Sequence, residues 1–381
     1  MTLRRAFFAA ACVLLSACDS DDQDEAAQRQ PQNAAIAEPV AEETLPAEQR
    51  VLQETLIAEA NAFDGSLGVA VYDIERDRLI HVNGEQMFPQ QSLSKLWVAL
   101  AALQRVDSAE LRLRERVSVL RSDLTVFHQP IRKIMLARGS YHTDYADLLR
   151  RAITESDNTA NDMLLKRVGG PPGVRNTLSH AGLDGIRFGP GEREMQSTLA
   201  ALEWDPSMSI GKRFFDMRKA VPAAQRRAAF DSYVANPVDG ARPAAIEEAL
   251  GRLAKGELLQ PDTTSIMLGL LDDVKSGPNR LKGGVPAGWS IGHKTGTGQV
   301  LDTVPPGVIG EQTGYNDAGI LTAPDGRRYA VAVLIGRTAT PISVRMEFMH
   351  RIVAAIVAYH YQANGQVGPP NMRHIIHQNA R

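Results

Sequence analysis

Cysteine is nearly absent from this chain. Of 381 residues only Cys12 and Cys18 are cysteines, and from Asp19 onward there is none. That part of the chain therefore forms no disulfide and contains no thiol nucleophile or thiolate metal ligand. No H-E-x-x-H motif or Cys/His cluster occurs either, so we predict no zinc site and no cofactor. The stability of the folded part must come from its core.

An excess of charge of either sign is also missing. The chain has 42 Lys and Arg against 44 Asp and Glu, which gives a net charge of −2. Without a basic stripe or a recognisable binding motif, nucleic acid is not expected as a partner. The 44% hydrophobic content is typical of a globular protein and is sufficient for a sizeable core.

The apolar run at the N-terminus is too short to span a membrane. It covers residues 6–17 and follows Arg4 and Arg5, which is the layout of a secretory signal. Its end, "LSAC", resembles the bacterial lipoprotein signal, in which cleavage leaves a lipidated cysteine at the new N-terminus. We therefore predict a signal peptide over residues 1–17 and lipidation of Cys18. A plain signal peptide is the alternative.

The residues after Cys18 predict where the chain resides and how it is attached. Asp19 follows directly, and in the enterobacterial version of this system that residue implies retention at the inner membrane. Acyl chains on Cys18 would be enough for stable attachment on the periplasmic side. Between Asp19 and Gln49 there are nine acidic residues, one arginine and no aromatic residue. Such a segment cannot bury enough apolar surface to fold, so we predict an acidic, disordered tether over residues 18–46.

Strand-like segments occur at both ends of the remaining chain, and helical segments lie between them. Residues 47–62 have helical spacing, and "LGVAVYDIERDRLIHVN" predicts a hairpin. The segments "GWSIGHKTG", "DAGILTA" and "YAVAVLIGRT" predict three late strands, and residues 342–361 a final helix. The prediction is an α+β domain over residues 47–362: an antiparallel sheet flanked by helices, plus an all-helical lobe. Residues 363–381 are expected to be a loose tail.

Three short motifs follow one another in this domain. They are "SLSK" from Ser92 to Lys95, "SDN" from Ser156 to Asn158, and "KTG" from Lys294 to Gly296. Each is weak alone, because S-x-x-K recurs at residues 209–212 and a K-S-G occurs at residues 275–277. The signal lies in their order and in the elements that carry them: the start of a buried helix, the helical middle and a late strand.

The residue types fit nucleophilic catalysis by a serine. A hydroxyl is a poor nucleophile until a base removes its proton, and Lys95 lies one helical turn after Ser92. Lys294 would keep the pocket positive, which favours a neutral Lys95 and attracts an anionic substrate. Ser156 can relay a proton to a leaving nitrogen, and Asn158 can hold a substrate amide. The backbone N–H of Ser92 offers half of an oxyanion hole.

With these motifs the sequence resembles the class A serine β-lactamases, within the family of penicillin-recognising acyl-serine enzymes. The likeness extends to "FPQQS", "SDNTANDMLLKRVGGP" and "GPNRLKGGVPAGW". It implies a β-lactamase/transpeptidase-like fold, a monomer and a small-molecule β-lactam substrate. The implied reaction is hydrolysis of the β-lactam ring through an acyl-serine, which gives antibiotic resistance.

The resemblance also implies a glutamate that hydrolyses the acyl-enzyme. Class A enzymes carry it in an E-x-x-L-N motif on a loop, and this string is absent. Gap-free alignment places Glu192 there, in "EREMQ", a form closer to the PER-like branch. Gln91 and Asp162 match that branch as well. Glu192 would orient a water and accept its proton. The alternatives are that Glu192 is a solvated loop charge, or that Glu194 acts in its place.

The same resemblance implies the residues that bind substrate. Thr297 would supply the second oxyanion N–H, and Thr295 would contact a substrate carboxylate beside Gly296. The arginine usual in the family aligns with Asn316, so we expect Arg280 to replace it; the alternative is a surface arginine.

Phe127 would be an aromatic gatekeeper at the mouth of the cleft, or else a core residue. His128 and His293 receive no role. Residues 197–240 include about 30 residues more than typical members have. This segment has helical spacing and is either an insertion packed beside the catalytic loop or a lid or partner surface that changes substrate access. It could also misplace Glu192.

Two other functions use the same nucleophile. A D,D-carboxypeptidase or penicillin-binding protein would act on cell-wall peptides without an efficient deacylating glutamate. A non-catalytic receptor would remain acylated and signal the presence of an antibiotic. Glu192 favours the β-lactamase over both, and no transmembrane signalling segment was found in the sequence.

Overall fold

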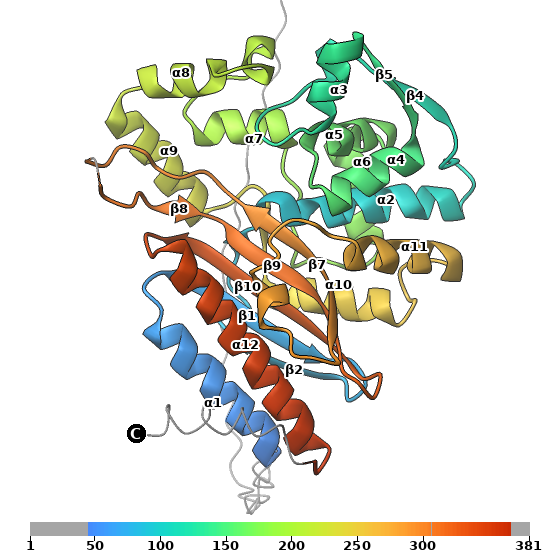
Figure 1. Ribbon diagram of the computed structural model, residues 1–381, viewed down its shortest axis with the longest axis vertical. Helices are drawn as coiled ribbons and strands as arrows, with labels where there is room; N and C mark the ends of the chain where they lie inside the picture. Colours follow the sequence, from blue (N-terminus) through green and yellow to red (C-terminus); the bar gives the residue numbers. More distant parts are fainter. Residues whose placement is uncertain (1–44, 306, 367–381) are drawn as a thin grey trace, which may run out of the picture. The chain divides into compact units, whose positions relative to one another are not determined.

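Strands from both ends of the chain lie side by side in one antiparallel sheet (Figure 1). The computed structural model describes residues 45–305 and 307–366. The strand order is β2-β1-β10-β9-β7, and β8 pairs with β10. The bounds are β1 Ser66–Asp73, β2 Arg78–Val82, β7 Ser290–Thr297, β8 Gln312–Thr313, β9 Tyr315–Thr322 and β10 Arg328–Thr338. The predicted sheet of terminal strands is confirmed.

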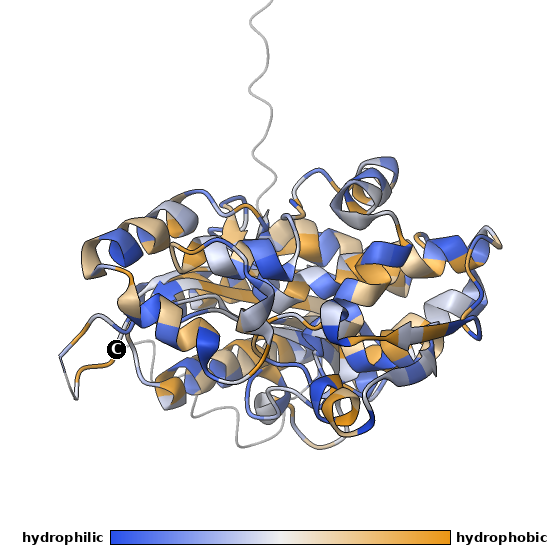
Figure 2. Cartoon of the chain, turned by 90° about the horizontal axis from the view of Figure 1, so that it is seen from above, coloured by the Kyte–Doolittle hydropathy of each residue, from blue (hydrophilic) through white to orange (hydrophobic). Residues whose placement is uncertain are grey.

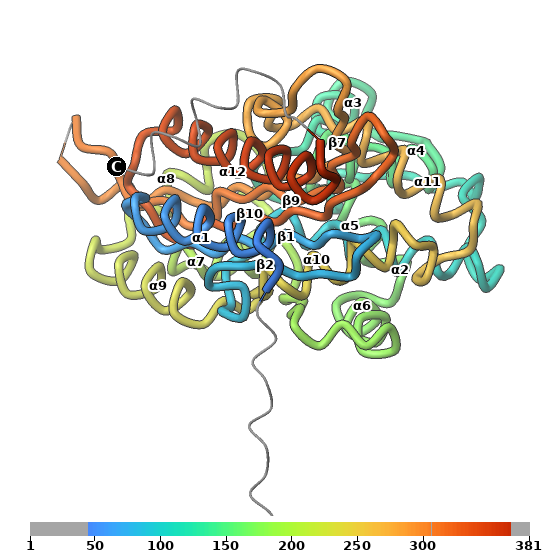
Figure 3. Tube along the Cα trace, turned by 90° about the horizontal axis from the view of Figure 1, so that it is seen from below, coloured from blue at the N-terminus to red at the C-terminus, as the bar shows by residue number. Residues whose placement is uncertain are grey.

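One face of the sheet is covered by the first and last helices, α1 (Ala47–Ala62) and α12 (Ile342–Ala363), which lie side by side (Figures 1 and 3). Their apolar residues, Leu56 and Ile356 among them, are fully buried against the sheet. Alternate β1 residues such as Val69 join this core, as the two-residue period of a strand requires. Burial of this apolar surface is what holds the two chain ends together.

The opposite face packs against helices from the middle of the chain. These are α2 (Lys95–Asp107), α10 (Pro243–Ala254) and α11 (Pro261–Asp272). In α2 every residue from Lys95 to Leu103 is buried, because helices enclose it as well as the sheet. The buried helix predicted from Ser92 begins instead as a 3₁₀ turn, Gln91–Ser94, and becomes α-helical at Lys95.

A helical lobe lies beside α2 (Figure 1). It contains α3 Ile131–Arg138, α4 Tyr145–Thr154, α5 Asn158–Arg167 and α6 Gly170–His180. The prediction of an all-helical lobe is wrong in one detail, since β4 (Arg116–Val119) and β5 (Tyr141–Asp144) form a two-stranded ribbon there. A second short pair joins β3 (Phe88–Pro89), just before Ser92, to β6 (Gly240–Ala241).

Three further helices follow the lobe: α7 Glu192–Leu199, α8 Arg213–Ala220 and α9 Ala223–Ala235. Met195 and Leu199 of α7 pack against Phe230 and Tyr233 of α9 in a small core of their own. The outer helices carry both hydrophilic and hydrophobic residues (Figure 2), which is typical of surface helices with one buried side.

Several predictions fall outside the described residues. They concern the signal peptide, Cys18, the tether as far as residue 44 and the tail from residue 367. Among the helices of the described part, none combines the length and apolar character needed to cross a membrane.

Candidate active site

Ser92 and Lys95 meet at the start of α2. The Nζ of Lys95 donates to the Oγ of Ser92 over 2.8 Å, and the Lys95 side chain is 1% exposed. Within the 3₁₀ turn the serine precedes the lysine by three residues, which puts both side chains on one face. The buried amine of Lys95 thus contacts the hydroxyl of Ser92 directly.

Gln91, the residue before the serine, has a left-handed backbone conformation with φ of +54°. Such a conformation costs about 1 kcal/mol or more and persists where contacts enforce it. The N–H of Gln91 donates to Asp239 Oδ2 over 2.7 Å, and its Nε2 donates to the hydroxyl of Tyr233 over 2.5 Å. Tyr233 in turn donates to Asp239 Oδ1 over 2.8 Å. Two residues distant in sequence therefore fix the turn that presents Ser92.

The "SDN" motif forms the turn between α4 and α5. Ser156 has φ of +56°, which reverses the chain, and Asp157 caps α5 by accepting from the N–H of Ala160 over 2.9 Å. The other oxygen of Asp157 accepts from the N–H of Ile131 over 2.7 Å. Asn158 is the first residue of α5, so the motif aims Ser156 and Asn158 at the Ser92 side of the lobe.

Lys294 lies on β7 and is fully buried. Its Nζ donates to Ser156 Oγ over 2.9 Å and to the carbonyl of Thr295 over 2.9 Å. Burial first, and then the positive charge of Lys95, hold the pKa of Lys294 well below its usual range. Lys294 therefore loses its proton more readily than an exposed lysine would. The next residue, Thr295, is hydrogen-bonded through Oγ1 to the hydroxyl of Ser276 over 2.7 Å.

Gly296 allows β7 to approach the segment before Ser92. A Cβ at this position would lie 2.3 Å from the carbonyl oxygen of Gln90, so only glycine fits. Asn316, on β9, ties the same segment to the sheet by donating from Nδ2 to the carbonyl of Pro89 over 2.6 Å. Asn316 is fully buried and so has a structural role at the position that the resemblance aligns with the arginine of class A enzymes.

Glu192 is the first residue of α7, where we had predicted a loop, and it is 7% exposed. Its Oε2 lies 3.8 Å from Lys95 Nζ. Its Oε1 accepts from Asn158 Nδ2 over 3.0 Å and from Gln196 Nε2 over 3.1 Å. The alternative of a solvated loop charge is therefore wrong. Glu194, in contrast, is exposed and lines a different cavity.

Arg280 is buried beneath β7, so the alternative of a surface arginine is wrong. Its Nη1 donates to the carbonyls of Gly296 over 2.9 Å and Asn316 over 2.6 Å, and its Nη2 donates to Thr297 Oγ1 over 2.5 Å. The guanidinium also lies 3.8 Å from the ring centre of Tyr315. The charge thus sits under the strand that carries the "KTG" motif, in contact with Thr297.

A cavity of about 210 Å³ connects these side chains; we call it the Ser92 cavity. Its lining comes from all three motifs and from α7. The lining residues are Ser92, Phe127, His128, Glu155, Ser156, Asn158, Glu192, Gln196, Ser276, Thr295 and Thr297. Lys95 and Lys294 reach it through the hydroxyls that they contact. Gly296, on β7, and Arg280, beneath that strand, do not line it.

Phe127 is partly buried, so it is not a core residue. It lines the Ser92 cavity, and its ring packs edge-on against Phe214 of α8 with ring centres 4.7 Å apart. Its φ of +62° turns the side chain toward α8.

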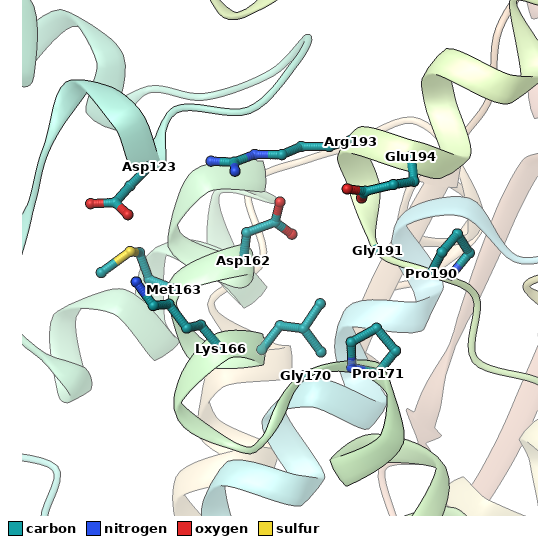
Figure 4. Close-up of a pocket in the computed structure, with 11 residues that line it drawn as sticks. Asp123, Asp162, Met163, Lys166, Gly170, Pro171, Pro190, Gly191, Arg193 and Glu194 are labelled. Atoms are coloured by element: carbon teal, nitrogen blue, oxygen red, sulfur yellow. The ribbon is translucent and has the colours of Figure 1, made fainter. Parts of the chain in front are cut away.

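Asp162 lines a separate cavity of about 390 Å³, together with Gly191. Its carboxyl group points to the side of this cavity where Arg193 and Glu194 lie (Figure 4). Burial, and next the negative charge of Glu192, raise the pKa of Asp162 to about 7. The Oδ1 of Asp162 is buried without a hydrogen-bond partner. Asp162 is thus a second carboxyl group beside the catalytic region, ionised less readily than an ordinary aspartate.

Sequence reasoning missed several residues that shape the site. Ser276, dismissed with the K-S-G decoy, lines the Ser92 cavity, and so does His128. His293 is buried and hydrogen-bonded to Asp317 over 2.8 Å, away from that cavity. Tyr233 carried no local signal. In residues 45–305 and 307–366, no group of three or more His, Cys, Asp or Glu side chains is arranged to hold a metal ion.

Comparisons with known proteins identify the family of the chain. The family model described as "Beta-lactamase enzyme family" matches residues 50–360. The chain is 26% identical to the extended-spectrum β-lactamase PER-1 of Pseudomonas aeruginosa, over 77% of this chain and 82% of that protein. It is 23% identical to β-lactamase VEB-1 of Pseudomonas aeruginosa, over 80% of this chain and 87% of that protein.

Solved structures give the same result. A β-lactamase from Chitinophaga pinensis superimposes with a TM-score of 0.63 at 25% identity, covering 81% of this chain and 98% of that one. An ancestral class A β-lactamase superimposes with a TM-score of 0.61 at 28% identity, covering 80% and 98%. The chain belongs to the β-lactamase enzyme family. It is a class A-like serine β-lactamase, which hydrolyses the β-lactam ring of antibiotics and so gives resistance to them.

Proposed function

We propose that Ser92 is the nucleophile of this β-lactamase and that Lys95 takes its proton. The observation that carries the proposal is the buried Nζ of Lys95, 2.8 Å from Ser92 Oγ and 3.8 Å from Glu192 Oε2. The serine oxygen attacks the lactam carbonyl carbon and forms an ester, while the C–N bond of the ring breaks. The leaving nitrogen takes a proton from Ser156, which Lys294 replenishes through its 2.9 Å hydrogen bond.

Hydrolysis of the ester is assigned to Glu192. Its carboxylate is held by Asn158 and Gln196 and faces the Ser92 cavity. In the proposed step Glu192 accepts a proton from a water, whose oxygen attacks the ester carbonyl. The ester C–O bond then breaks, and Ser92 Oγ takes back the proton that Lys95 removed during acylation. The step consumes one water and leaves a carboxylic acid product.

The way Asn158 is hydrogen-bonded defines how it would meet substrate. Its amide N–H groups donate to the carbonyl of Val126 over 2.9 Å and to Glu192 over 3.0 Å. An asparagine amide has two donors, so the oxygen remains for substrate. We therefore expect Asn158 to accept a hydrogen bond from the N–H of the acylamino side chain of a β-lactam.

The carboxylate of the substrate is assigned to β7. Thr295 and Thr297 line the Ser92 cavity, and Arg280 supplies a positive charge through its contact with Thr297. The backbone N–H groups of Ser92 and Thr297 form the proposed oxyanion hole. Gly296 keeps β7 close to the serine, and Phe127 forms the mouth.

Peptide mapping after exposure to a slowly hydrolysed β-lactam tests the nucleophile. The adduct is expected on the peptide containing Ser92, absent from Ser92→Ala and retained in Ser94→Ala. Ser94 is a suitable control because it lies two residues away and donates to the backbone of Gln91 over 2.7 Å. An adduct on Ser92→Ala, or on another peptide of the parent, would contradict the assignment.

For location, the proposal is a monomer in the periplasm, attached to the inner membrane by lipid on Cys18. The "LSAC" sequence and the following Asp19 support it. Membrane fractionation and measurement of the intact mass test this location. The parent should sediment with inner membranes and carry acyl chains, and Cys18→Ser should be soluble. Equal solubility of both proteins would refute the anchor.

A further inference from the structure

A second cavity adjoins the Ser92 cavity, and half of its lining residues belong to the 197–240 segment. It has a volume of about 320 Å³, and Phe127 and His128 line both cavities. Its other walls include Met208, Phe214 and Phe215. We call it the Phe215 cavity. Because the two cavities share wall residues, a ligand in one lies next to the other.

A strip of three residues, 126–128, lies between the two cavities. Hydrogen bonds hold it to residues on the side of the Ser92 cavity. Asn158 donates from Nδ2 to the carbonyl of Val126 and from its backbone N–H to the carbonyl of His128, both over 2.9 Å. The ring of His128 is hydrogen-bonded to the carbonyl of Glu155 over 2.9 Å. Phe127, between these fixed residues, has φ of +62°. The strip thus holds one aromatic ring at the border between the cavities.

Three aromatic rings meet at this border. Phe127 lies 4.7 Å from Phe214 and 5.9 Å from Phe215, measured between ring centres. Phe214 is 1% exposed and belongs to a small core, whereas Phe215 is 48% exposed. Burying Phe214 explains why α8 docks here. Phe215 stays half exposed, with the guanidinium carbon of Arg218 5.6 Å from its ring centre. Aromatic groups bind other aromatic groups at such ring edges and faces.

We propose that the Phe215 cavity is a subsite for an aromatic ring on the acylamino side chain of a β-lactam. We infer this occupant because the two cavities are connected. Asn158 is the expected acceptor of the substrate's side-chain N–H, and it is hydrogen-bonded to the strip that bounds the Phe215 cavity. A ring one or two carbons beyond that amide would pass Phe127 and contact Phe215. The subsite rests on the proposed function, and it gives the 197–240 segment a role in substrate preference.

The test compares two penicillins with the same nucleus, one with a phenylacetyl and one with an acetyl side chain. Removing ring contacts from an apolar pocket changes discrimination by about 10-fold. Phe215→Ala should therefore lower kcat/KM for the phenylacetyl compound about 10-fold and leave the acetyl compound within about 2-fold. Phe215→Tyr should keep the preference of the parent. Leu136→Ala is the matched control, since Leu136 is 47% exposed on α3 and does not line the cavity.

The outcomes separate the subsite from the function. If the parent hydrolyses both compounds and Phe215→Ala affects them equally or not at all, the subsite is wrong and the enzyme assignment stands. If the parent hydrolyses neither compound, the proposed function fails and the subsite fails with it. Thermal unfolding of each variant excludes a loss of folded protein as the cause of an equal decrease.

Discussion

The Nζ of Lys95 lies 3.8 Å from the Oε2 of Glu192, with both side chains buried. The same amine is 2.8 Å from Ser92 Oγ, so a single lysine stands between the nucleophile and the carboxylate. Hydrogen bonds from Asn158 and Gln196 to the other carboxylate oxygen complete the arrangement. Charges can remain buried in this way only when each has partners. Ser92, Lys95 and Glu192 therefore form one connected group of side chains that serves both proposed steps, acylation and deacylation.

Removing the lysine should leave Glu192 as a buried, unpaired charge. We expect Lys95→Met to abolish acylation and to lower the free energy of unfolding at pH 8 by about 3 kcal/mol. Urea unfolding of the parent and the variant measures this loss. Adding Glu192→Gln to Lys95→Met should recover part of the stability at pH 8; a further loss would refute the charge pair.

Asp162 should make stability depend on pH. The pKa of Asp162 is about 7 in the folded protein, against 3.8 for an ordinary aspartate, so the folded state binds the proton more tightly. This contribution is fully present below about pH 4 and is lost as pH rises through 7. Relative to Asp162→Asn, which cannot ionise, the parent should lose on the order of 2 kcal/mol of unfolding free energy between pH 5 and pH 8. Parallel pH profiles for the two proteins would contradict this pKa.

Tyr233 should affect catalysis from a distance, because its hydroxyl connects Gln91 with Asp239. Tyr233→Phe leaves both partners unsatisfied, which should cost about 1–3 kcal/mol of stability. Misplacement of the Ser92 turn should also lower kcat about 10-fold. Tyr141→Phe is the matched control, since the hydroxyl of Tyr141 donates to Asp147 over 2.6 Å away from the site. An equal effect of both substitutions on kcat would show that Tyr233 is only structural.

The sheet, the order of its elements and the positions of the three motifs were predictable, because periodicity is local. Helix α1 and the β1–β2 hairpin lie at the predicted residues. The contact between Gln91 and Tyr233 was not predictable, since 142 residues separate them and no pattern marks Tyr233. Ser276 was missed because the K-S-G match alone does not predict that the fold places Ser276 within hydrogen-bond distance of Thr295. The helical start at Glu192 was missed because the resemblance to class A enzymes placed this glutamate on a loop.

Deacylation by Glu192 is the central claim. The most direct measurement is stopped-flow hydrolysis of a chromogenic cephalosporin, followed by intact-protein mass spectrometry, on the parent, Glu192→Gln and Glu194→Gln. Loss of a general base slows a step by about 10²- to 10⁴-fold. We therefore predict rapid turnover by the parent and by Glu194→Gln, and an acyl adduct that accumulates on Glu192→Gln. A parent that itself remains acylated, or a Glu192→Gln enzyme that turns over as fast as the parent, would contradict the account.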